Sequence, residues 1–85
     1  MPNYVVILSK NAQKQLDKIP LHIVEPILQG IESLGADPRP VGCKKLKGRD
    51  GFRIRVGNYR VIYEIFDKQL IVDVITVGHR RDIYQ

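Results

Sequence analysis

The spacing of apolar residues changes halfway along the chain. Residues 3–8 are rich in valine and isoleucine and predict a buried strand. After Ser9, a candidate N-cap, apolar residues recur at helical spacing and predict a first helix closed by Pro20, with Ala12, Leu16 and Ile19 on its inner side. A second helix is predicted up to Gly35, which would stop it in the left-handed conformation, with an apolar stripe of Ile23, Ile27, Leu28, Ile31 and Leu34. Pro26 requires this helix to begin near residues 21–23 or to carry a kink.

From Cys43 onward the apolar period is two, which is typical of strands. After a loop over residues 36–42, we expect an edge strand over residues 44–47 and further strands over 52–56, 59–66 and 70–77, the last ended by Gly78. The last strand is apolar on both faces and is therefore predicted to lie inside the sheet. Gly57-Asn58 predicts a two-residue hairpin, and residues 67–68 predict a weaker one. The expected fold is α+β, a single domain over residues 1–85 in which two N-terminal helices pack on one face of a small, mainly antiparallel sheet in the order β-α-α-β-β-β-β.

A two-residue turn at Gly57-Asn58 fixes which side chains share a face of the hairpin. Arg55 would lie opposite Arg60, and Arg53 opposite Ile62, so that the three arginines share the face away from the helices. The other face would be apolar and would pack on the helices through Phe52, Ile54, Val56, Tyr59, Val61, Tyr63 and Ile65. Like charges directly opposite cost up to about 1 kcal/mol unless an anion lies between them. Either Glu64 and Asp73 neutralise this cluster, or it is a phosphate site, which arginine suits.

Charge makes the second interpretation stronger. The chain holds fourteen Lys and Arg residues against nine Asp and Glu residues, a net charge of +5, and residues 39–60 alone hold eight basic residues and one acidic residue, a net charge of +7. A concentrated basic segment indicates a polyanionic partner, above all nucleic acid, although a solvated face serving solubility is the alternative. Contacts along an RNA backbone would come from Lys44, Lys45, Lys47 and Arg49.

Composition excludes several classes of protein. Hydrophobic residues at 44% and charged residues at 27% are typical of a soluble globular domain and exclude the disordered and membrane classes. No secretory signal is apparent, and Cys43 has no partner for an intrachain disulfide, so we expect a cytoplasmic protein. One cysteine and two distant histidines do not make a zinc site, and we expect no metal and no other cofactor.

The C-terminal residues carry the remaining candidate chemistry. After Gly78 the chain reads His79-Arg80-Arg81-Asp82-Ile83-Tyr84, which combines an imidazole, two guanidinium groups and a phenol. We expect residues 79–85 to form a short tail or a single helical turn. A basic terminus docked on the core by Ile83 and Tyr84 is the structural alternative. Together with the arginine face, however, these groups offer phosphate binding, base stacking and proton transfer.

Three segments carry a family resemblance that covers essentially the whole chain. The runs 56–63 (VGNYRVIY), 77–84 (VGHRRDIY) and 37–40 (DPRP) with 46–48 (LKG) closely resemble the RelE branch of the RelE/ParE toxin superfamily. The resemblance implies a small sheet with two packed helices and the role of a toxin in a type II toxin–antitoxin module. It further implies an endoribonuclease that cleaves mRNA in the ribosomal A site and is neutralised by a RelB-like antitoxin.

The resemblance also implies residue roles. Arg53 and Arg55 match two basic positions of the family, often lysines in relatives, and Arg60 matches the arginine that contacts the scissile phosphate. Arg80 matches the basic residue after the last strand, Tyr84 matches the terminal aromatic that stacks on a base or assists proton transfer, and Arg81 is expected to contact RNA. Since arginine does not lose its proton, the general base falls to His79, Tyr84 or Glu64. Two alternatives stay open: a ParE-like inhibitor of DNA gyrase, and a small RNA-binding module without catalysis.

Overall fold

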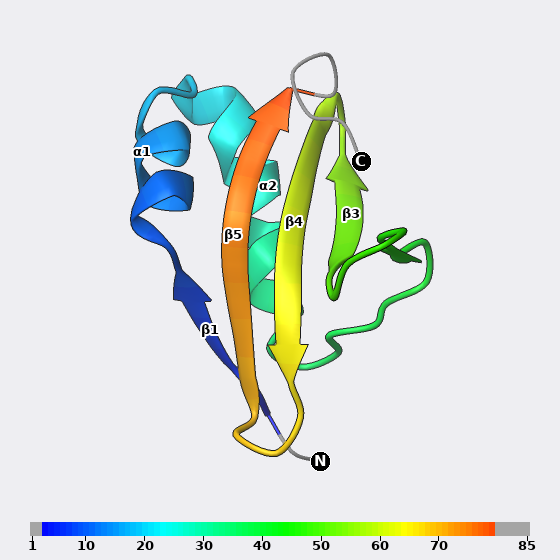
Figure 1. Cartoon of the computed structure of the whole chain (residues 1–85). Coiled ribbons are helices and arrows are strands. Elements are labelled where there is room, and N and C mark those ends of the chain that lie inside the picture. The colour runs from blue at the N-terminus through cyan, green and yellow to red at the C-terminus, as the bar shows by residue number, and fades with distance from the viewer. Residues whose placement is uncertain (1–2, 80–85) are drawn as a thin grey trace.

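A computed structural model describes residues 3–79 and shows two helices covering one face of a five-stranded sheet (Figure 1). In chain order the elements are β1 (Val5–Leu8), α1 (Lys10–Asp17), α2 (Leu21–Ser33), β2 (Lys44–Lys45), β3 (Phe52–Val56), β4 (Tyr59–Phe66) and β5 (Ile71–His79). The strands lie in the order β1-β5-β4-β3-β2; β1 runs parallel to β5, and the other pairs are antiparallel. The predicted fold class, element order and interior position of the last strand are confirmed.

Both helices follow from their sequence signals. Ser9 caps α1 as predicted: its Oγ accepts a hydrogen bond from the Ala12 amide at 3.0 Å and donates one to the carbonyl of Ile75 in β5 at 2.8 Å. α2 begins at Leu21 and contains Pro26, which is exposed and lines a hollow between α2 and the turn of the β3–β4 hairpin. The buried side of α2 differs from the predicted stripe at two positions: Leu28 is 42% exposed, and Val24, which was not predicted, is buried.

Gly35 follows α2 for a different reason from the one predicted. Its backbone is not left-handed; within residues 3–79, positive φ angles occur only at four other glycines and at Leu70. A Cβ at Gly35 would instead lie 3.0 Å from the carbonyl oxygen of Tyr4, whose amide donates to the Gly35 carbonyl at 2.7 Å. The glycine therefore permits the entry to β1 to run against the end of α2.

Several strand ends differ from the predicted ones. β2 stops at Lys45, because Leu46 turns inward and is buried. Leu70 was predicted to lie in the last strand but occupies a left-handed position (φ 56°) in a turn over residues 67–70, which replaces the predicted hairpin at residues 67–68. β5 continues through Gly78, which pairs with Arg60, to His79.

The main core lies between the helices and the sheet. The seven hairpin residues predicted to face the helices all belong to it, and Val61 and Tyr63 are 0% exposed. A second, smaller core on the other face was not predicted: Leu46 packs against Ile62 and covers part of this face. None of the helices within residues 3–79 combines the length and apolar character needed to cross a membrane.

Candidate nucleic-acid interface

The arginine face is arranged as the hairpin turn predicts. Arg55 lies directly opposite Arg60 and Arg53 opposite Ile62, and Gly57 takes the positive φ of 59° that a tight turn requires. Arg55 is exposed, Arg53 and Arg60 are half-buried, and the Nε of Arg60 is fully buried. Because Ile54 and Val61 alternate with them into the main core, the three arginines share the face without helices.

The two carboxylates of this face do not pair with the arginines. Glu64 and Asp73 lie directly opposite one another on β4 and β5, and both are half-buried. Within residues 3–79 the ion pairs comprise Arg39 with Asp67 and no other, so Glu64 and Asp73 face each other as like charges. The alternative that they neutralise the arginine cluster finds no support in the described part of the chain.

Four of the predicted RNA-contacting residues lie in or just after the edge strand β2, and they do not share one face. Lys44 lies opposite Arg53 and lines, with Gly42, Arg53 and Arg55, a hollow of ≈ 250 Å³. Lys45 points to the other side, where its Nζ lies 5.5 Å from the ring centroid of Phe52. Lys47 and Arg49 are exposed in the turn after Leu46 and do not line this hollow. The structure therefore joins Lys44 to the arginine face and leaves the other three apart from it.

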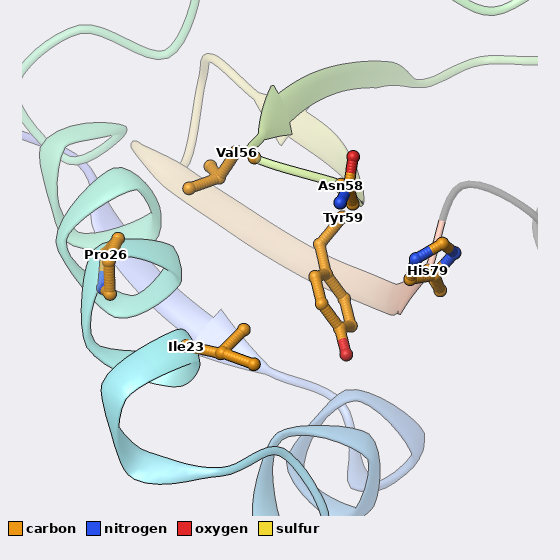
Figure 2. Close-up of a pocket in the computed structure, with 7 residues that line it drawn as sticks. Ile23, Pro26, Val56, Asn58, Tyr59 and His79 are labelled. Carbon is orange, nitrogen blue, oxygen red and sulfur yellow. The ribbon is translucent and has the colours of Figure 1, made fainter.

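His79 does not share the face of the arginines. It lies opposite Tyr59 at the end of β5, and the two rings meet edge to face at 5.5 Å and 74°. Both residues line, with Ile23 of α2, a hollow of ≈ 320 Å³ on the helix side of the sheet, and Figure 2 shows the Tyr59 ring between Ile23 and His79. This hollow was not predicted. The turn at Gly57-Asn58 determines the register of β3 with β4, but it carries no signal for where β5 ends. Arg80, Arg81 and Tyr84 lie outside the described residues.

Two contacts hold the loop that leads to β2. The Tyr63 hydroxyl donates to the Pro38 carbonyl at 2.8 Å, and burial raises the pKa of Tyr63. Arg39 donates hydrogen bonds to the Asp67 carboxylate from its two terminal guanidinium nitrogens, at 3.3 and 2.9 Å. The Tyr4 hydroxyl donates to the same carboxylate at 2.6 Å. The hydrogen bonds from Arg39 and Tyr4 lower the pKa of Asp67. Arg39 is thus committed to the β4–β5 turn, and the loop delivers Gly42 and Lys44 to the basic hollow.

The site offers charge and shape rather than metal ligands. Within residues 3–79 no group of three or more histidine, cysteine, aspartate or glutamate side chains could hold a metal ion. Guanidinium groups on a sheet surface bind phosphate oxygens with two parallel hydrogen bonds each, and they keep their charge at every physiological pH. The arginine face can therefore bind a phosphodiester and stabilise added negative charge on it.

Comparison with known proteins places the chain in a family. The sequence model of the family described as "ParE toxin of type II toxin-antitoxin system, parDE" matches residues 6–84. The chain is 32% identical over 84 residues to Toxin RelG of Mycobacterium tuberculosis. The aligned region covers 96% of this chain and 97% of that protein.

Solved structures agree with this assignment. The toxin–antitoxin complex RelBE2 of Mycobacterium tuberculosis contains a chain with a TM-score of 0.84 and 29% identity, covering 96% of this chain and 97% of that one. The archaeal RelE–RelB complex of Pyrococcus horikoshii contains one with a TM-score of 0.83 and 28% identity, covering 95% and 99%. The predicted resemblance is confirmed, and the chain belongs to the RelE/ParE family of type II toxin–antitoxin toxins.

Proposed function

We propose that this toxin is a ribosome-dependent endoribonuclease of the cytoplasm that cleaves mRNA in the A site. The observation that carries the proposal is the arginine face: Arg55 directly opposite Arg60, with Arg53 beside them and Lys44 at the rim. Guanidinium groups gathered on one face of a sheet favour binding of a phosphodiester, because each can donate two parallel hydrogen bonds to phosphate oxygens. A surface that served solubility alone would gain by separating these charges.

The proposed reaction is attack of a ribose 2′-oxygen on the adjacent phosphorus. The 2′-O–P bond forms and the P–O5′ bond breaks, giving a 2′,3′-cyclic phosphate and a 5′-hydroxyl. A base takes the proton of the 2′-hydroxyl, and an acid supplies one to the leaving 5′-oxygen. Arg53, Arg55 and Arg60 stabilise the extra negative charge of the phosphorane, and Arg80 is proposed to add to it.

Three side chains are proposed for proton transfer, two of them at or after the end of β5 and one in β4. His79 follows Gly78, which pairs with Arg60, so its backbone lies at the edge of the arginine face although its ring packs on Tyr59. Tyr84 is the second candidate, as a proton donor or by stacking on a base, and Glu64 the third. Orientation of the message by the ribosome compensates for this modest acid–base equipment, because positioning alone is worth several kcal/mol. Lys44, Lys45, Lys47, Arg49 and Arg81 are proposed to hold the RNA backbone.

The proposed protein partner is a RelB-like antitoxin. The solved relatives from Mycobacterium tuberculosis and Pyrococcus horikoshii are complexes of a toxin with its antitoxin. With a net charge of +5, this chain favours an acidic partner that masks its basic surface until the partner is removed.

Two other functions compete with cleavage. The matching family model is described as ParE, which favours a ParE-like inhibitor of DNA gyrase as the second candidate. The arginine face argues for the nuclease, because binding to a protein does not require clustered guanidinium groups on a sheet. An RNA-binding module without catalysis would use the same face, and its RNA affinity would fall steeply with salt.

The test is to map 5′ ends of a translated message in an extract with and without ribosomes. We expect cuts within the reading frame that require ribosomes, and Arg60→Ala should reduce them by about 100-fold. Lys14→Ala, which removes an exposed charge from α1, is the matched control and should cut normally. Normal cutting by Arg60→Ala would overturn the site assignment, and gyrase-linked DNA breaks without RNA cuts would favour the ParE-like function.

A further inference from the structure

β1 leaves one edge of the sheet open to a further strand. It is the first strand in the order β1-β5-β4-β3-β2 and lies at the left edge of the sheet in Figure 1. The amides of Val5 and Ser9 donate to carbonyl oxygens on the β5 side, at 2.8 and 2.9 Å. Because backbone groups alternate in direction along a strand, the N–H and C=O groups of Val6 and Leu8 point to the open side.

The residues of this edge do not prevent strand pairing. Sheet edges in soluble proteins are commonly protected by a charged residue, a proline or a bulge. Residues 3–9 (NYVVILS) contain neither a charged residue nor a proline, and β1 pairs with β5 in one continuous register from Val5 to Leu8. The open side of β1 is therefore a template on which another strand can add.

Exposed apolar side chains gather beside β1 on both faces of the sheet. On the face without helices, Val5 is 63% and Ile7 44% exposed, and Ile7 lines a hollow with Phe66 and Ile71. On the helix side, the half-exposed Leu28 of α2 lines a groove of ≈ 460 Å³ along β1. Neighbouring exposed apolar side chains of this kind mark interaction surfaces of soluble proteins.

We infer that a second copy of this chain pairs with β1, antiparallel to it. The distribution of charge favours a copy over an acidic partner. Lys44, Arg53 and Arg55 lie in β2 and β3, at the opposite edge of the sheet, and an acidic chain gains most there. Two copies that meet at β1 contact each other through the uncharged residues 5–8 and keep their arginine faces apart.

The direction of the backbone groups selects the register of this pair. The register that uses both open residues of each copy pairs Val6 of one copy with Leu8 of the other, and Leu8 with Val6. Ile7 then lies on the two-fold axis, with its Cα about 4.5 Å from that of the same residue of the second copy, in a position without backbone hydrogen bonds. The two sheets join into one, and both arginine faces stay open on the same side of it.

Sedimentation equilibrium of the purified chain, free of antitoxin and RNA, measures the association. The interface is small, so we expect a dissociation constant of about 1–100 μM. Since each copy has a net charge of +5, raising NaCl from about 50 to about 500 mM should strengthen the dimer. Ile7→Lys places two ammonium groups opposite each other and removes an apolar contact, and it should weaken the dimer about 10-fold or more. Leu21→Lys is the matched control and should dimerise normally, because Leu21 is 73% exposed and lines neither hollow beside β1.

Disulfide cross-linking tests the register. In a Cys43→Ser background, which removes the free thiol, Ile7→Cys should oxidise to a covalent dimer, because the two Cα atoms lie within reach of a disulfide. Val5→Cys is the control: Val5 is more exposed, but the same residue of the second copy would lie about 14 Å away. A monomer at up to about 300 μM, a dimer that Ile7→Lys leaves unchanged, or equal cross-linking of the two cysteine variants would overturn the inference. Loss of antitoxin binding in Ile7→Lys without any self-association would also overturn it and assign the edge to the antitoxin.

Discussion

Replacing Arg55 by threonine should make this toxin more stable and less active. Arg55 is exposed, lies directly opposite Arg60, and makes no hydrogen bond or ion pair with a residue of 3–79. Its removal therefore costs no hydrogen bond or ion pair there and relieves a cross-strand repulsion worth about 0.2–1 kcal/mol. Exposure to water places the gain near the lower end, at about 0.3–0.5 kcal/mol.

Thermal unfolding at low ionic strength measures this gain. For a domain of this size, about 0.3–0.5 kcal/mol corresponds to a rise in Tm of about 1–4 °C. Threonine also favours strands, and that contribution is independent of salt. The electrostatic part is the part lost in 1 M NaCl, where the screening length falls to about 3 Å. Arg55→Lys keeps the charge and is the control, with an unchanged Tm.

If the proposed function holds, cleavage should fall about 100-fold in Arg55→Thr, because the variant lacks a guanidinium group that we propose stabilises charge in the transition state. The opposite directions of the two effects are the signature of a functional charge cluster. A Tm below that of the unaltered protein at low salt, or a gain that is the same in 1 M NaCl, would refute the repulsion argument.

Three further predictions concern the contacts that hold the site in place. Tyr63→Phe leaves the buried Pro38 carbonyl without its donor and should destabilise the fold by about 1–3 kcal/mol in urea unfolding, whereas an unchanged midpoint would show that the bond contributes nothing. Asp67 has a lowered pKa in the folded state, so its contribution to stability is present at neutral pH and is lost as the pH falls below about 4. Asp67→Asn should therefore make the Tm depend less on pH between about pH 3 and 6. Parallel Tm profiles for the variant and the unaltered protein would contradict this. Gly35→Ala places a methyl group 3.0 Å from the Tyr4 carbonyl and should cost about 1–3 kcal/mol, read from chemical denaturation, and a cost near zero would show that β1 shifts freely.

The sequence by itself determined the hairpin and what each of its faces carries. Alternation with a period of two and a tight turn at Gly57-Asn58 are local properties, and together they fix that Arg55 lies opposite Arg60. The Ser9 cap and the start of α2 are equally local, and both were predicted correctly. Gly35 shows the limit of such local signals. The sequence predicted that a glycine ends α2, but the reason that a side chain does not fit there is the nearby backbone of the β1 segment, more than thirty residues earlier.

Only the tertiary structure decided what each charged group meets. The sequence carries no signal that Arg39 pairs with Asp67, which lies 28 residues away. Nor does it indicate that Tyr4 donates to the same carboxylate, which is 63 residues from it. Likewise the end of β5 set His79 against Tyr59 rather than among the arginines, and the part of β4 that runs past β3 placed Glu64 beside Phe52 and Lys45. Turn chemistry and side-chain alternation act over a few residues, whereas these pairings depend on strands that close long stretches of chain, so their partners follow from packing of the whole domain.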